Sequence, residues 1–283
     1  MSSANSRRLS GGLKPATQAI VADTTPVRQR LQGMGLMGAS FGAGTIIGGL
    51  IAILSGSTFL SESYIGLALL MFGSAVWVVV SVPESRDSEE KSVAFTKLFP
   101  ALPYLFATIS ALTMYGALQP ITSWVLQDLL LLPPHQAIRF TGVIMMSSMF
   151  AMVACQLVLL KVRFNFYAIK TMGALVTTTA LLVSASCDSL WHLIASMTVL
   201  GMGLGLFLPA NLALLSLTTD HHQQGRLGGL NGMCQGIGLA IGPVVGNFLY
   251  QMWYPLPYFL FATLFALLAF HGHKSARTIE QSY

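Results

Sequence analysis

The sequence has little charge and little cysteine. Asp, Glu, Lys and Arg make up 9% of its 283 residues, while 54% are hydrophobic; an ordinary soluble domain is about 25% charged. Such a chain cannot cover itself with a solvated surface, which excludes a soluble globular enzyme. The three cysteines, Cys155, Cys187 and Cys234, are isolated from one another, so neither a metal site nor a disulfide framework is predicted.

Long apolar runs indicate that most of this chain lies in lipid. A helix needs about 20 apolar residues to cross a bilayer, and these runs are about twice as long as a membrane β-strand. The predicted fold is therefore all-α, a polytopic membrane helical bundle, and its expected partners include the lipid bilayer that surrounds it. The eight predicted spans are residues 33–54, 64–82, 102–127, 140–160, 168–186, 190–215, 229–250 and 254–271.

Basic residues predict the orientation of the bundle, because short loops rich in Lys and Arg stay in the cytoplasm. Outside the polar leader, eleven of the twelve Lys and Arg residues fall on one side of the predicted bundle, and only Arg139 falls on the other. We expect a multi-pass protein of the inner (plasma) membrane with both termini cytoplasmic. Because these residues are spread over several loops, the net charge of +5 does not indicate nucleic-acid binding. The eleven are Arg28, Arg30, Arg86, Lys91, Lys97, Lys161, Arg163, Lys170, Arg226, Lys274 and Arg277.

Two stretches of the chain are similar to each other. Residues 11–48 align with residues 205–242 without a gap, with 13 identities in 38 positions that include Pro15, Thr24 and Thr25. Chance similarity between glycine-rich helices is one alternative, but a duplication better explains why the proline and the threonine pair fall in register. Parallel repeats of this kind build transporters whose two halves rock about a central site.

The duplication predicts two repeated halves of unequal length. Three spans of the second half precede its copy of the repeat, and their counterparts would need about 95 further residues before the first copy. We therefore expect the N-terminal half to be incomplete, without three helices and part of a fourth. The expected divisions are a partial first half at 1–82, a cytoplasmic linker at 83–99, a six-helix second half at 100–273 and a cytoplasmic tail at 274–283.

Glycines recur on corresponding helices of the two copies. Small residues let membrane helices approach closely, and a proline in a helix removes a backbone donor and favours a bend. Two interpretations stay open, a pliable gating helix and simple tight packing. The predicted positions are Gly38, Gly42, Gly44, Gly48 and Gly49 in the first copy and Gly236, Gly238, Gly242 and Pro243 in the second.

Two segments carry a resemblance to a known family. Residues 236–246, Gly-Ile-Gly-Leu-Ala-Ile-Gly-Pro-Val-Val-Gly, resemble the fifth-helix motif of antiporters of the major facilitator superfamily. Residues 15–26 and the arginines after them are similar to the end of the family's fourth helix and the following loop, with Asp23 and Arg30 as the loop-motif candidates. The resemblance runs from about residue 11 to the last span, as part of helix 4 through helix 12. It implies a proton-driven exporter of a small organic molecule, drug-like or siderophore-like, monomeric when complete and without a cofactor.

Polar side chains within the spans are the candidates for a substrate cavity, since each costs free energy in lipid and usually faces a bundle interior. For each of them an interhelical hydrogen bond is the commoner arrangement, and a substrate contact is the alternative. Asp128 lies at the outer end of a span, where we expect a helix-end role, with proton coupling as the alternative. The cavity candidates are Gln119, Gln156, Gln235, Asn211 and Asn231.

One motif that suggests an enzyme fails in its context. Gly38-Ala-Ser40-Phe-Gly42 matches the G-x-S-x-G pattern of serine hydrolases, but that pattern requires a strand-to-helix turn and a partnering histidine. The motif lies in an apolar run, and every histidine falls in a loop or at a span end. We expect a transporter with no catalytic residue and no metal ion. A non-transporting remnant and a membrane receptor or assembly partner are the alternative hypotheses.

Overall fold

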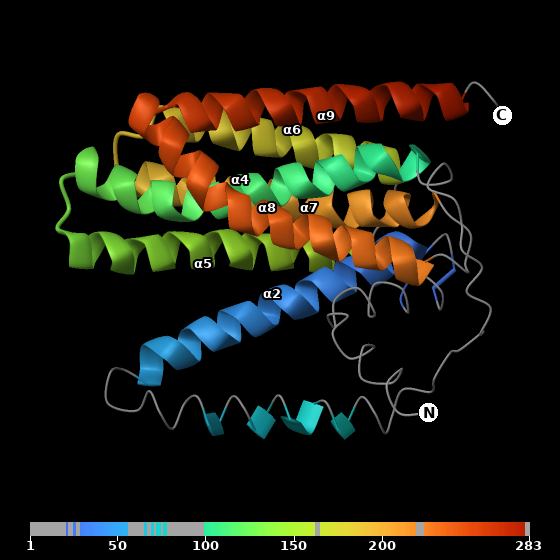
Figure 1. The fold of residues 1–283 in the computed structure, drawn as a ribbon, viewed down its shortest axis with the longest axis horizontal. Helices are drawn as coiled ribbons and strands as arrows, with labels where there is room; N and C mark the ends of the chain where they lie inside the picture. The colour runs from blue at the N-terminus through green and yellow to red at the C-terminus, as the bar shows by residue number, and fades with distance from the viewer. Residues whose placement is uncertain are drawn as a thin grey trace, which may run out of the picture.

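The computed structural model describes residues 29–55, 99–161, 165–218 and 224–280, together with residues 21, 25–26, 65–66, 69–70, 72–74 and 76–77; the side chains at 45, 48–55 and 271–280 are not described. The expected span at 64–82 and the expected linker at 83–99 therefore lie largely outside the description. The described part contains seven named helices (Figure 1): α2 (Arg30–Ser55), α4 (Leu102–Asp128), α5 (Pro134–Leu159), α6 (Phe166–Ala185), α7 (Leu190–Ser216), α8 (Gln224–Met252) and α9 (Leu256–Glu280).

The helices begin at residues that suit a helix start. Pro134 opens α5, where the missing amide hydrogen has no helical acceptor to lose. The side chain of Asn165 accepts a hydrogen bond from the Tyr167 amide at 3.0 Å and caps α6. The Ser189 hydroxyl oxygen does the same for the His192 amide of α7 at 3.3 Å. These caps satisfy amide hydrogens that the first turn of a helix leaves without a backbone partner.

The prediction of an all-α membrane bundle is confirmed. Within the described residues, five helices are long and apolar enough to cross a membrane, and they coincide with α4 to α8. The apolar part of α9 is shorter, Leu256–Phe270, and the helix continues to Glu280, past the expected boundary at residue 273. The first expected span, 33–54, lies within α2.

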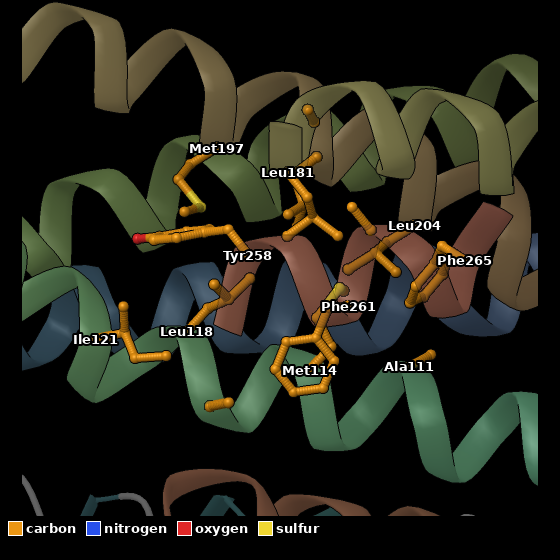
Figure 2. Close-up of a cluster of buried hydrophobic side chains, with 14 of the residues drawn as sticks. Ala111, Met114, Leu118, Ile121, Leu181, Met197, Leu204, Tyr258, Phe261 and Phe265 are labelled. Atoms are coloured by element: carbon orange, nitrogen blue, oxygen red, sulfur yellow. The ribbon is translucent and has the colours of Figure 1, made fainter. Parts of the chain in front are cut away.

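Helices α4 to α9 alternate in direction and form one bundle (Figure 1). The most extensive contacts join α4 to α8, α6 to α7, α5 to α7 and α6 to α9. Their shared core is apolar and fully buried, with Tyr258, Phe261 and Phe265 of α9 lying among side chains from α4, α6 and α7 (Figure 2). Phe265 also contacts the ring of Phe207, with 5.2 Å between the ring centroids.

Helix α2 packs against α5 and α7 from outside this bundle. It begins at the same end as α4, α6 and α8, which we call the Arg30 end, and α5 and α7 terminate there. In Figure 1, α2 runs obliquely and diverges from α5 away from the Arg30 end. The opposite end of the bundle, where α4 terminates, is called the Asp128 end.

Candidate functional site

A buried polar network joins three helices near the Arg30 end. The Thr108 hydroxyl of α4 donates a hydrogen bond to the Asn231 side-chain oxygen of α8 at 2.9 Å. The Asn211 amide of α7 donates to the same Thr108 hydroxyl at 3.1 Å and to the Tyr104 carbonyl at 2.9 Å. Thr108, Asn211 and Asn231 are each no more than 4% exposed. Two of the five predicted cavity residues therefore form interhelical hydrogen bonds, the commoner of the two arrangements considered.

Lys170 lies beside this network. Its charge was counted with the basic loop residues, although the predicted span 168–186 contains it. The structure places it in α6, one turn after the helix begins and 2% exposed. Its ammonium nitrogen lies 4.5 Å from the ring centroid of Tyr104 and 5.8 Å from that of Phe207. Attraction between a cation and an aromatic ring face is strongest where water is excluded.

Arg30, the first residue of α2, joins that helix to the same end of the bundle. Its guanidinium group donates to the carbonyl oxygen of Ser216 at 3.3 Å and to the Ser216 hydroxyl at 3.4 Å. Ser216 is the last residue of α7, and the carbonyl end of a helix carries partial negative charge. The Gln224 amide of α8 donates to the same carbonyl at 2.7 Å. Arg30 is therefore a buried contact between α2 and α7 rather than an exposed loop charge.

A small pocket lies next to the Arg30 contact, with room for about one water molecule. Helices α2, α7 and α8 contribute its wall. The lining residues are Met34, Leu212, Leu215, Ser216, Gln224, Leu227 and Gly228.

Gln156 faces the first glycine repeat rather than an open cavity. It is 2% exposed, and a methyl group added at Gly38 would lie 2.8 Å from its amide nitrogen. Its side-chain oxygen has no hydrogen-bond partner among the described residues. One turn further along α2, Gly42 lies against Val153 of the same helix α5, whereas Gly44 has nothing within 4 Å. The α2 contacts at these positions thus fall on the half of α5 nearest the Arg30 end.

The second glycine repeat packs α8 onto α4. Methyl groups added at Gly238 and Gly242 would lie 2.8 Å and 2.5 Å from the carbonyl oxygens of Ile109 and Thr113. Gly236 faces open space, with nothing within 4 Å. Such close backbone approach is the usual role of small residues in membrane helices.

The other candidates are scattered. Gln119 is exposed and Gln235 is half-buried, so neither belongs to the buried network. Asp23 and the side chains at positions 48 and 49 lie outside the described residues, and Pro243 lies within α8. Asp128 is the last residue of α4, where its carboxylate accepts a hydrogen bond from the Tyr250 hydroxyl at 3.0 Å.

The sequence did not indicate a site role for Thr108 in the buried network or for Lys170 beside it. Thr108 has no sequence signal of its own, because threonine is common in membrane helices and often bonds only to its own backbone. Lys170 had a signal, since the predicted span 168–186 already contained it. Within the described residues no group of three or more His, Cys, Asp or Glu side chains is placed to hold a metal ion.

The arrangement of the helices is shared with a large family of transporters. The Major Facilitator Superfamily model matches residues 9–161 and 104–272, which together cover most of the chain. The chain belongs to the Major Facilitator Superfamily. It is thus a multi-pass membrane protein of a transporter family, not of an enzyme family.

Curated relatives within the superfamily carry names that refer to resistance. Over 273 residues the chain is 26% identical to "Tetracycline resistance protein, class B" of Escherichia coli, covering 88% of this chain and 66% of that protein. It is 25% identical over 282 residues to "Multidrug resistance protein 1" of Bacillus subtilis (strain 168), covering 91% and 69%. The chain therefore spans about two thirds of the length of the curated relatives it matches.

Solved structures of superfamily transporters show the same fold. The human organic anion transporter MFSD10 superposes with a TM-score of 0.75 at 17% identity, covering 90% of this chain and 66% of that one. The transporter FucP, in the outward conformation, superposes with a TM-score of 0.65 at 16% identity, covering 92% and 72%.

Proposed function

We propose that the chain acts as a secondary transporter that exports a small organic molecule by alternating access and is driven by protons. The names of its curated relatives, which refer to resistance to tetracycline and to multiple drugs, support export of organic molecules. The proposal places it in the inner membrane with the Arg30 end in the cytoplasm. In support, Lys161 and Arg226 are exposed at that end, whereas Arg139 is near the opposite end.

The observation that carries the proposal is the way α2 meets the bundle. It is held to α7 by Arg30 and Ser216, it approaches α5 at Gly38 and Gly42, and it diverges from α5 away from the Arg30 end (Figure 1). Alternating access requires helices that meet at one end of the membrane and separate at the other, and then reverse. Hydrogen bonds of 3.3 and 3.4 Å, long for this bond type, suit a contact that must be broken in each cycle.

A reversible cross-link between α2 and α5 tests this movement. A β-carbon built at Gly35 lies 3.9 Å from that of Leu159, within the range of about 3.5–4.5 Å that a disulfide needs. The variant G35C/L159C, in a background with the three native cysteines replaced by serine, would be reconstituted in proteoliposomes. Uptake of tetracycline and of a cationic dye would be measured under an imposed pH gradient. The single variants G35C and L159C are the matched controls.

We expect pH-driven flux in the reduced double variant, loss of flux on oxidation and recovery after reduction, with no effect of oxidant on the single variants. Unchanged flux in the fully oxidised double variant would contradict the proposed movement. Absence of solute flux from the unmodified chain under any gradient would contradict the transport function itself. That second result would favour the non-transporting remnant or the receptor hypothesis.

A further inference from the structure

Lys170 is a buried cation without a counter-ion among the described residues. Among the described residues, its contacts of a polar or electrostatic kind are with the ring faces of Tyr104 and Phe207. The described carboxylates Asp128 and Asp188 lie at the Asp128 end, on the far side of the membrane span. Burying an ammonium group is strongly unfavourable unless an anion or several acceptors surround it.

An unpartnered acceptor lies on the same helix faces. The side-chain oxygen of Asn211 is buried and accepts no hydrogen bond from the described residues. Asn211 is held next to Tyr104 by the bond from its amide to the Tyr104 carbonyl. It also lies one helical turn after Phe207, so both residues share the face of α7 that meets Lys170 and Tyr104.

Aromatic contact alone accounts poorly for this arrangement. A cation–π contact offsets only part of the cost of removing the ammonium group from water. Charged residues within membrane helices usually mark a substrate or ion pathway for this reason. The side-chain oxygen of Asn211, next to Tyr104, likewise has no donor among the described residues.

We propose that Lys170, Tyr104 and Asn211 form a binding site for a small organic carboxylate with an apolar body. The ammonium group of Lys170 pairs with the ligand carboxylate, and the rings of Tyr104 and Phe207 contact its apolar part. The side-chain oxygen of Asn211 accepts a hydrogen bond from a hydroxyl or amine of the ligand. The inference rests on the proposed function, because the carboxylate is the molecule transported, but binding can be measured without transport.

The pocket beside Arg30 offers the route to this site. Leu212 lines that pocket and packs in the same apolar cluster as Tyr104. We expect separation of α2 from α7 at Ser216 to open the pocket on this side. A carboxylate therefore enters from the Arg30 end, the cytoplasmic end in the proposed orientation.

Binding of a matched pair of probes tests the site. Titration calorimetry on the purified full chain in lipid nanodiscs would compare 2-naphthoate with 2-naphthamide, which share the ring system and differ in charge. Inorganic phosphate distinguishes a general anion site from one for organic carboxylates. The variants are K170M, K170R and, as the matched control, K161M, which removes an exposed lysine at the same end.

We expect the unmodified chain and K161M to bind 2-naphthoate about 10- to 100-fold more tightly than 2-naphthamide, the range for a hydrogen bond to a charged group. K170M should lose this preference, and K170R should keep most of it. K170M should also unfold at a temperature no lower than the unmodified chain, because methionine removes a buried charge that has no counter-ion in the described part of the chain. Loss of the preference together with lower stability would indicate a structural lysine and overturn the proposal.

Other outcomes separate this inference from the proposed function. Equal binding of the two naphthalene probes, or a preference for 2-naphthoate that survives in K170M, would refute the carboxylate site even if uncharged solutes are transported. Phosphate binding as tight as that of 2-naphthoate would refute the organic part of the assignment. Carboxylate binding that depends on Lys170, without pH-driven flux of any solute, would leave the site standing and contradict the transporter.

Discussion

The two glycines Gly242 and Gly236 provide a matched test of how α8 is held. Both lie on α8, six residues apart, yet a methyl group at Gly242 would lie 2.5 Å from the Thr113 carbonyl oxygen and 2.9 Å from the Ala117 nitrogen, both in the α4 backbone. At Gly236 the same methyl group would meet nothing within 4 Å. Substitution by alanine therefore makes the same chemical change in two opposite environments.

The expected free energies follow from two opposing effects. Alanine gains up to about 1 kcal/mol over glycine within a helix, and both variants share this gain. Overpacking costs about 1–3 kcal/mol, and G242A should lie at the upper limit because its clash is with backbone atoms that cannot rotate away. G242A should thus lose about 2 kcal/mol of unfolding free energy, and G236A should match or exceed the unmodified chain.

Unfolding by SDS in mixed micelles measures both variants under the same conditions. The midpoint SDS fraction should be lowest for G242A, higher for the unmodified chain and highest for G236A. Coincident midpoints for the two variants would refute the close α4–α8 contact. A lower midpoint for G236A than for G242A would show that the structure has the faces of α8 reversed.

Further predictions concern the buried network and a thiol. T108V removes the hydroxyl that joins Asn211 and Asn231, and it should lower the unfolding free energy by about 0.6–2 kcal/mol. The control T108S should have a stability close to that of the unmodified chain. An unchanged unfolding free energy in T108V would contradict the network. Burial, and to a lesser degree the charge of Asp188, raise the pKa of the Cys187 thiol. Since only the thiolate reacts, alkylation of Cys187, with the other cysteines replaced by serine, should be slow at neutral pH and still rise above pH 9. D188N should shift that rise to lower pH, and a plateau in rate below pH 8 would contradict the raised pKa.

Much of the fold could be predicted from residue type and run length alone. The runs at 102–127 and 190–215 match α4 and α7 closely, because the free energy of placing a segment in lipid depends on that segment's own composition. The resemblance carried by residues 236–246 led to the family that the comparison shows. These are local properties, and the sequence contains them without reference to any neighbour.

The candidate site could be predicted only in part. Polarity within a span identified Asn211 and Asn231 as bundle-interior residues, but it did not reveal that Thr108 joins them. Helical periodicity puts Gly38 and Gly44 on different faces of a helix, but it could not show that a methyl group at Gly38 would meet Gln156 while one at Gly44 would have nothing within 4 Å. Knowing that a residue is small or polar does not reveal what stands opposite.

The sequence by itself determined that this chain lies in lipid, which segments are helical and which family it belongs to. Tertiary structure alone decided the roles of two basic residues that the sequence analysis counted as loop charges, Arg30 at the end of α7 and Lys170 against Tyr104. The physical reason is that the two kinds of interaction depend on different parts of the chain. Transfer into lipid is summed over each segment separately, whereas hydrogen bonds and cation–π contacts depend on distances of a few Å between helices far apart in the chain.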